Sequence, residues 1–240
     1  MYRIGKRLAF EAAHRLTERP DLDVRSRLHG HCFTVEVVLA SDALTFPGFV
    51  VDFAALNPLK GYLAETFDHR MLNDVLDGPP TGRTLTDHLR GWCEDTLGLP
   101  NAVTVDAVGV RTGRPDSAEQ PRGWQGRCEF ETAHRLPGLP VDHPCARLHG
   151  HSYTAALTLD GDALLDPDTV LRPLAAYLHE RFDHRYLNEE LDTPPTSEHL
   201  AAHMYGWAVK ELSLPPGTHV RAARVSETAS TWAEYAVGPQ

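Results

Sequence analysis

Polar and apolar positions alternate along the chain directly after two His-Gly-His triplets. In HGHCFTVEVVLA, which begins at His29, every second side chain up to Leu39 is a histidine or apolar. The segment from Tyr153 to Leu159 repeats this face. Because successive side chains of a strand point to opposite faces, the pattern predicts two strands that each bury one face.

Apolar residues at three- and four-residue steps indicate a helix in each half of the chain. They occur in AALNPLKGYLAETF and in TVLRPLAAYLHERF, and both segments lead into an FDHR motif. Thr81 and Thr196 follow prolines and are good N-cap residues, so they predict the start of a second helix. The closing segments AVTVDAVGV and VRAARVSET are typical of strands. These elements predict an α+β fold with two modules, each an antiparallel four-stranded sheet with two helices on one face.

The two halves of the chain are an internal repeat. FEAAHRL and RLHGH recur as FETAHRL and RLHGH at an offset of 120, and FDHRMLN recurs as FDHRYLN at an offset of 115. The change of offset indicates that the second copy has lost five residues. We therefore predict a first module at residues 1–115 and a second at residues 126–240. Residues 116–125, in a stretch rich in glycine and proline, are expected to be the linker.

Composition and charge narrow the function classes. The chain has 240 residues and a formal net charge of −10, which disfavours nucleic acid, a ligand that selects basic surfaces. No apolar run reaches the roughly 18 residues of a membrane span, and charges follow the N-terminus too soon for a secretory signal. We therefore expect a cytoplasmic protein without a membrane partner. Its four cysteines have unrelated spacings and no C-x-x-C pair, which predicts reduced thiols and no thiolate zinc site.

Histidines at matching positions indicate a metal site in each module. In the second module His149 and His151 are two positions apart on a predicted strand, so their side chains point to the same side. His134, on the preceding strand-like segment, could supply a third ligand. The first module has the same arrangement, with His14, His29 and His31. Three imidazoles with an open fourth position are typical of catalytic zinc. The alternative is a surface turn with solvated histidines, and the recurrence of the third histidine weighs against it.

The order of the motifs resembles the 6-pyruvoyl-tetrahydropterin synthase family, which includes the 6-carboxytetrahydropterin synthases. FxxAH is followed by C-x-x-x-HGH in the second copy, then by DH-x-x-LN, PT-x-E and a late Glu-Thr pair. The resemblance spans nearly the whole of both modules, and the spacing of the cysteine is similar to the bacterial carboxypterin branch. It implies the tunnelling fold, in which small sheets join edge to edge into a barrel.

The resemblance implies a full catalytic set in the second module. It identifies the three histidines of that module as zinc ligands and Cys145 as the catalytic thiol. Asp183 and His184 resemble its acid/base partners, and Glu227 resembles the carboxylate that reads the pterin ring. The residue types suit these roles, because a nearby metal lowers the pKa of a thiol and imidazole exchanges protons near neutrality. The simpler alternatives are that Cys145 is a buried small residue, that Asp183 and His184 form a charge pair at a helix end, and that Glu227 is a solvated strand residue.

The first module keeps its histidines but departs from the family pattern at three positions. Arginines replace the cysteine and two glutamates in our alignment, at Arg25, Arg83 and Arg111. A guanidinium cannot act as a base near neutral pH or accept the donors of a pterin. Asp68 and His69 nevertheless persist, and in a family whose sites form between subunits they could complement a neighbouring active site. We expect a metal-retaining module without chemistry of its own, and the alternative is a surface with unrelated arginines.

The resemblance also implies a function and an assembly. The leading hypothesis is a zinc-dependent conversion of dihydroneopterin triphosphate to 6-carboxytetrahydropterin, the entry to 7-deazapurine compounds such as queuosine. Synthesis of 6-pyruvoyl-tetrahydropterin, or another cleavage of a dihydropterin side chain, is the second hypothesis. A non-catalytic pterin- or metal-binding protein is the third. Two stacked barrels of three modules each need three chains, so we expect a homotrimer.

Overall fold

The protein consists of two compact units that do not follow the repeat boundaries. The computed structural model describes residues 1–16, 24–113, 124–161 and 166–237, and most of the expected linker lies outside them. The first unit comprises Gly5–Ala40 and Val51–Ala118. The second unit comprises Met1–Ile4, Ser41–Val50 and Glu119–Gln240. The second unit therefore includes a loop that belongs, by sequence, to the first repeat. Within the described part of the chain, no helix is long and apolar enough to span a membrane.

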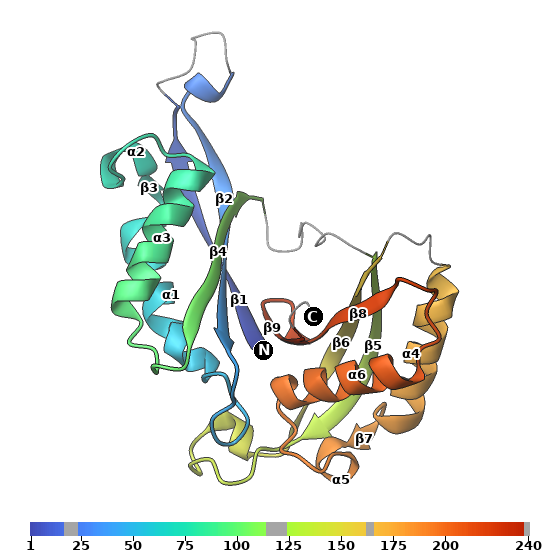
Figure 1. Ribbon diagram of the computed structural model, residues 1–240. Coiled ribbons are helices and arrows are strands. Elements are labelled where there is room, and N and C mark those ends of the chain that lie inside the picture. Colours follow the sequence, from blue (N-terminus) through green and yellow to red (C-terminus); the bar gives the residue numbers. More distant parts are fainter. Residues whose placement is uncertain (17–23, 114–123, 162–165, 238–240) are drawn as a thin grey trace. The chain divides into compact units, whose positions relative to one another are not determined.

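The first repeat forms a small sheet covered by helices. The strands lie in the order β4-β2-β1, and the short β3 pairs in parallel with β1. Figure 1 shows α1 and α3 along one side of these strands. The strands are β1 (Tyr2–His14), β2 (His29–Ser41), β3 (Arg70–Met71) and β4 (Thr104–Thr112). The helical elements are η1 (Val24–Ser26), η2 (Phe53–Leu56), α1 (Asn57–Thr66), α2 (Leu72–Val75) and α3 (Gly82–Thr96).

The second unit repeats this plan with one more long strand. Its strands lie in the order β9-β8-β6-β5-β7, and all neighbours are antiparallel except β5 and β7. The strands are β5 (Trp124–His134), β6 (His149–Asp160), β7 (Arg185–Tyr186), β8 (His219–Thr228) and β9 (Thr231–Ala236). The helical elements are η3 (Pro144–Ala146), α4 (Pro167–Arg181), α5 (Leu187–Glu190) and α6 (Ser197–Glu211).

These elements confirm the predicted α+β class with one difference in strand number. The second unit has the four long antiparallel strands that the sequence predicts, β5, β6, β8 and β9. Among its described residues, the first repeat has three long strands and the two-residue β3. Both predicted N-caps are confirmed, because Thr81 accepts a hydrogen bond from the Thr84 N–H and Thr196 accepts one from the His199 N–H.

The core of the second unit lies between the sheet and its two long helices. Leu157 of β6, Leu174 of α4 and Leu200 of α6 are each at most 1% exposed and belong to one apolar cluster. Burial of such a side chain contributes about 1.5–3 kcal/mol. The period-2 face of β6 therefore fixes which side of the sheet the helices cover. The same rule sets the direction of the histidines that open this strand.

Candidate functional site

Three histidines of the second unit converge on one point. His134 lies directly opposite His149 in the β5–β6 register, and His151 follows on the same face of β6. Their nearest ring nitrogens all lie within 4.8 Å of one another. The first unit has an equivalent cluster, formed by His14, His29 and His31, whose nearest ring nitrogens also lie within 4.8 Å of one another. The predicted grouping of the histidines is confirmed in both units.

Backbone carbonyls hold the rings of two histidines in each cluster in one tautomer. In the second unit Nδ1 of His134 is 2.8 Å from the Pro195 carbonyl oxygen, and Nδ1 of His149 is 2.7 Å from that of Arg147. The first unit repeats both contacts, at 2.9 Å for His14 and 2.7 Å for His29. A proton on Nδ1 leaves the lone pair of Nε2 directed into the cluster, as a metal ligand requires.

The electrostatics of the clusters also fit a metal ion. Nε2 of His14 is buried and has no hydrogen-bond partner within the described residues. Burial lowers the pKa of His14 and His31, and it lowers the pKa of His134 and His151 in the same way. Neutral imidazoles are the ligand form, and three of them leave a fourth position open on a tetrahedral ion such as zinc. The residues present therefore fit one such ion in each unit.

In the second unit a tyrosine and a carboxylate adjoin the histidine cluster. The Tyr153 hydroxyl is 3.3 Å from Nε2 of His134 and also hydrogen-bonds with Glu227. The Ser197 hydroxyl donates to Glu227 Oε1 at 2.7 Å. Burial, and then the charge of Glu227, raise the pKa of Tyr153 well above 10, which keeps its proton on. The structure thus brings Glu227 to the cluster and adds Tyr153 and Ser197, which the sequence motifs did not single out.

A second carboxyl group lies buried beside this site. Glu198 follows Ser197 in the first turn of α6 and is 3% exposed. Burial raises its pKa from 4.5 to about 7, and the charge of Glu227 adds to the effect. Two carboxyl groups therefore lie close together, one at the start of α6 and one on β8.

Cys145 belongs to the loop that precedes β6. It lies in η3, where its N–H donates to Nδ1 of His143 at 3.1 Å and its carbonyl accepts from Leu136 N–H at 2.8 Å. After burial and the charge of Glu227, the electrostatic effect of Cys145 is a further cause that raises the pKa of Tyr153. The first unit has Arg25 in the equivalent η1, with the same backbone contact to Leu16 at 3.0 Å.

Asp183 and His184 lie on the other face of the sheet. Asp183 accepts the Glu131 N–H at 2.8 Å and pairs with Nδ1 of His184 at 3.0 Å. The Glu131 N–H bond is the main reason why the pKa of Asp183 is lowered. Nε2 of His184 is 3.9 Å from the Glu131 carboxylate, which faces away from His134 because side chains alternate along β5. His184 and His151 line one pocket of about 570 Å³, but the dyad lies on the Glu131 side of β5 and not on the side that carries His134.

The backbone at the dyad is strained and the ring is accessible. His184 has a φ of 56° and His69 a φ of 54°, which are unusual values for residues other than glycine. Their side chains are 74% and 79% exposed. The strain is repeated in both units, which favours a functional role over a local accident of packing.

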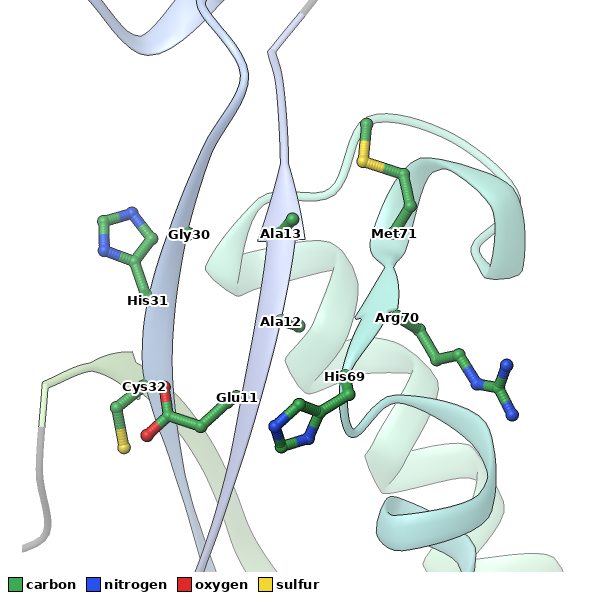
Figure 2. Close-up of a pocket in the computed structure, with 9 residues that line it drawn as sticks. All are labelled: Glu11, Ala12, Ala13, Gly30, His31, Cys32, His69, Arg70 and Met71. Carbon is green, nitrogen blue, oxygen red and sulfur yellow. The ribbon is translucent and has the colours of Figure 1, made fainter.

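The first unit has the same dyad next to a pocket of 540 Å³. Asp68 accepts the Glu11 N–H at 2.8 Å and pairs with Nδ1 of His69 at 2.9 Å. Figure 2 shows the Glu11 carboxylate between the Cys32 thiol and the His69 ring, while His31 points away from His69. In the second unit the position of Cys32 is a serine. The dyads are thus alike, and each lies on the face opposite to the cluster of its unit.

The strand register corrects one position of the repeat alignment. Thr34 pairs with Arg111, and its counterpart Thr154 pairs with Ser226. Arg111 is therefore equivalent to Ser226, and Thr112 is equivalent to Glu227. The sequence alignment had placed Arg111 at that position because no gap-free motif anchors the last strand. The first unit still lacks the carboxylate, but a threonine and not an arginine replaces it.

Comparison with known proteins finds a family match in both repeats. The model of the 6-pyruvoyl tetrahydropterin synthase family matches residues 3–120 and again residues 125–237. The dihydroneopterin monophosphate aldolase of Pyrococcus furiosus is 35% identical over 119 residues, which are 49% of this chain and 95% of the aldolase. The 6-carboxy-5,6,7,8-tetrahydropterin synthase of Bacillus subtilis is 30% identical over 115 residues, which are 43% of this chain and 76% of that protein.

A further relative and a solved structure extend the comparison. The 6-carboxy-5,6,7,8-tetrahydropterin synthase of Synechocystis is 33% identical over 117 residues, which are 44% of this chain and 86% of that protein. The 6-pyruvoyl tetrahydropterin synthase of Caenorhabditis elegans is 21% identical and has a TM-score of 0.40, over 48% of this chain and 94% of that one. Because the family model covers both repeats, this chain belongs to the 6-pyruvoyl tetrahydropterin synthase family, as a tandem duplicate.

Proposed function

We propose that the second unit is a zinc-dependent 6-carboxytetrahydropterin synthase that acts on dihydroneopterin triphosphate. The observation that carries the proposal is the convergence of three ligand histidines, with Tyr153 in contact with both His134 and Glu227. Two of the relatives described above are named as 6-carboxy-5,6,7,8-tetrahydropterin synthases, which supports this substrate class. Membership of the family supports an enzyme of the lyase type.

The carboxylate of Glu227 binds the pterin ring in this proposal. One carboxylate can accept two parallel N–H bonds, from the ring N–H and from the exocyclic amino group. The Ser197 hydroxyl already bonds Oε1 of Glu227 at 2.7 Å, which restricts the rotation of the carboxylate. The Tyr153 hydroxyl supplies a second contact and excludes water from the base of the site, since Tyr153 is 1% exposed.

The side chain of the substrate extends from the ring toward His134, His149 and His151. A zinc ion on these residues would polarise the hydroxyls of the substrate and acidify the adjacent C–H. The Sγ atom of Cys145 accepts that proton as the base, a role in which the thiolate is the active form. The neutral state of the histidines, which burial favours, leaves them ready as ligands at the same pH.

Asp183 and His184 exchange protons with a site of another copy of the chain in this proposal. The dyad is exposed and lies on the face opposite to the cluster of its own unit, so it cannot serve that cluster directly. Asp183 holds the proton of His184 on Nδ1, and Nε2 is left to accept or donate. Assembly of three chains into a closed ring brings such faces to neighbouring sites and removes exposed strand edges.

The first unit holds a metal but performs no chemistry in this proposal. It retains the three ligands and their carbonyl contacts. It lacks the thiol and the ring-binding carboxylate, because Arg25 and Thr112 occupy those positions. Neither residue can remove a proton near neutral pH or accept two N–H bonds as a carboxylate does.

A second candidate function is aldol cleavage of a dihydroneopterin phosphate. The relative that favours it is the dihydroneopterin monophosphate aldolase, which is 35% identical to this chain. Such an enzyme breaks a carbon–carbon bond of the same side chain and releases a phosphorylated two-carbon aldehyde. The ligand set and the thiol suit either reaction, so identification of the substrate and the products is needed to decide between them.

Product analysis separates these functions. Purified protein is given dihydroneopterin triphosphate and, in parallel, the monophosphate, and the products are identified by mass spectrometry. We expect a carboxypterin, acetaldehyde and inorganic triphosphate from the triphosphate. A phosphorylated aldehyde from the monophosphate would establish the aldolase instead, and a pyruvoyl pterin would establish the synthase of that name. Unchanged substrate with both compounds would contradict a catalytic role.

A further inference from the structure

A loop of the first repeat forms part of the second unit. The docking loop (residues 45–50) precedes Val51, where the first unit resumes. Its Val50 N–H donates to Oε1 of Glu198 at 3.1 Å, and its Gly48 carbonyl accepts from the Thr196 hydroxyl at 3.0 Å. Both partners belong to the start of α6, so the loop is fixed at two points to one helical turn.

The contact between loop and helix is tight and dry. Val50 is 1% exposed and Glu198 is 3% exposed. A Cβ atom on Gly48 would lie 2.3 Å from the His199 ring and 3.1 Å from the Thr196 hydroxyl, and Gly48 has a φ of +132°. Only glycine fits there, for two reasons. A side chain would clash with the ring, and residues other than glycine rarely adopt this backbone conformation. Hydrogen bonds without competing water are strong contacts.

The helical turn that the docking loop holds also orients Glu227. Ser197 lies between Thr196 and Glu198, the two residues bonded to the loop, and it donates to Glu227 at 2.7 Å. Hydrogen bonds on both sides of one helical turn therefore connect the backbone of the first repeat, through that turn, to the carboxylate proposed to read the pterin ring. Movement of the loop would shift the turn and with it the Ser197 hydroxyl.

The first unit does not retain the buried carboxylate of this arrangement. Its counterpart of Glu198 is Arg83, whose side chain is 91% exposed and 3.8 Å from Asp87 of the same helix. Its counterpart of Thr196 is Thr81, whose hydroxyl bonds Thr84 at 2.9 Å. The second repeat, for its part, has lost five residues between the positions of Pro47 and Leu56, a stretch that overlaps the docking loop. The loop of the first repeat and its acceptor in the second unit are therefore both present, whereas their counterparts are not retained as a pair.

We propose that the docking loop is a positioning element of the second unit's site, which holds the first turn of α6 so that Ser197 presents Glu227 to its ligand. The proposal rests on the proposed pterin-binding role of Glu227. It explains why the first repeat is retained although it lacks the thiol and the carboxylate. It also gives each chain one complete site, because the reverse contact has no loop and no acceptor.

Two pairs of full-length variants test this proposal. Glu198→Ala removes the acceptor of the Val50 N–H, and Arg83→Ala is the matched change in the first unit. Gly48→Ala introduces the clash with His199, and Gly78→Ala is its control, because Gly78 also has a positive φ of +110° but open space around it. A third variant, Glu198→Gln, keeps an oxygen acceptor and should rescue the loop.

Two measurements are made on each variant, with metal content and melting temperature as checks of folding. Amide hydrogen exchange of residues 45–50 reports the docking itself. We expect lost protection in Glu198→Ala and Gly48→Ala, and near-normal protection in Glu198→Gln and both controls. The KM for dihydroneopterin triphosphate should rise about tenfold or more in the first two variants, which corresponds to the loss of one or two buried hydrogen bonds. In the other three variants it should stay within about twofold.

The outcomes distinguish this proposal from the proposed function. Retained protection in Glu198→Ala and Gly48→Ala would overturn the docking. Lost protection with an unchanged KM would overturn the positioning role. If the native chain turns over no dihydropterin phosphate, the proposed function fails, and binding of a pterin measured by fluorescence quenching then replaces KM as the second readout.

Discussion

The two repeats share a scaffold and differ in a few polar side chains around it. Ring centroids of His14 and His29 are 4.5 Å apart, as are those of His134 and His149. A stacked tyrosine and tryptophan join the two long helices in each unit, at 4.5 Å and 4.4 Å. The dyads also agree, at 2.9 Å and 3.0 Å. Metal-binding geometry and helix packing are therefore properties of the common fold.

The differences gather at the histidine cluster of the second unit. Cys145, Tyr153, Glu198 and Glu227 have the counterparts Arg25, Phe33, Arg83 and Thr112 in the first unit. Each replacement removes an acid, a base or a hydrogen-bonding group, and none alters a strand or a long helix. The comparison teaches that the shared apolar core and backbone carbonyls set the metal geometry, while a few polar side chains set the chemistry. Matched substitutions in the two units can test this division.

Loss of a metal ligand should have the largest effect on activity and should have it in one unit only. His149→Ala and His29→Ala should each remove one metal ion per chain, from about two to about one, because each deletes one of three ligands. Turnover should fall by roughly 10³ or more in His149→Ala, since the metal contributes several kcal/mol to the transition state. It should change by less than about twofold in His29→Ala. Elemental analysis and a turnover assay measure both. Equal loss of activity in the two variants would contradict the division of labour.

Loss of the thiol should have the second-largest effect on turnover. Cys145→Ala should lower turnover by about 10² to 10⁴ without loss of metal, because it removes a positioned base. Arg25→Ala, the same position in the first unit, should leave turnover within about twofold. Turnover under saturating substrate and elemental analysis give the comparison. Near-normal turnover in Cys145→Ala would remove this thiol from the proposed mechanism.

The two dyads should differ although their geometries agree. Only the second unit has a thiol base, so one type of dyad in the assembly can reach it. His184→Ala should lower turnover by about 10², as expected for a lost general acid or base, and His69→Ala should leave it within about twofold. Light scattering on each variant checks that the assembly is retained. Equal effects of the two substitutions would show that both dyads act in the reaction.

Much of the fold follows from local sequence patterns. The alternation after each His-Gly-His triplet predicts β2 and β6 with the histidines on the buried face, and the structure confirms both. Thr81 and Thr196 cap the helices that the sequence assigns to them. The histidine clusters were predictable because position i and position i+2 of a strand share a face and the third histidine recurs.

Other features depend on contacts that no local pattern encodes. Membership of residues 41–50 in the second unit follows from hydrogen bonds to Thr196 and Glu198, about 150 positions further along the chain. The role of Ser197 depends on its distance to Glu227, which lies on another element. The face of Asp183 and His184 depends on the pairing of β7 with β5. Thr112 was missed because a one-residue shift in a strand exchanges its two faces.

The smallest predicted effect concerns stability and pH, and it also separates the two units. Glu198 is buried with a pKa raised to about 7, whereas its counterpart Arg83 is exposed. Glu198→Gln keeps the shape and an acceptor oxygen but cannot ionise. Arg83→Gln is the matched change at a site without a buried carboxyl group. The free energy of unfolding of both variants and the native chain is measured in urea from pH 4 to pH 8.

The sign follows from proton binding in the folded and unfolded states. Between pH 4.5, the ordinary pKa of the group, and about 7, folded Glu198 holds a proton that the unfolded chain has released. The contribution of Glu198 to the free energy of unfolding is therefore full below pH 4.5 and is lost as the pH rises through about 7. Glu198→Gln lacks this loss, so its stability relative to the native chain should rise across the window by roughly 3 kcal/mol and then level off. Arg83→Gln should follow the native curve within about 0.5 kcal/mol at every pH. A flat difference for Glu198→Gln would mean that Glu198 is ionised at neutral pH, with its charge compensated by the Val50 N–H and the turn that it caps.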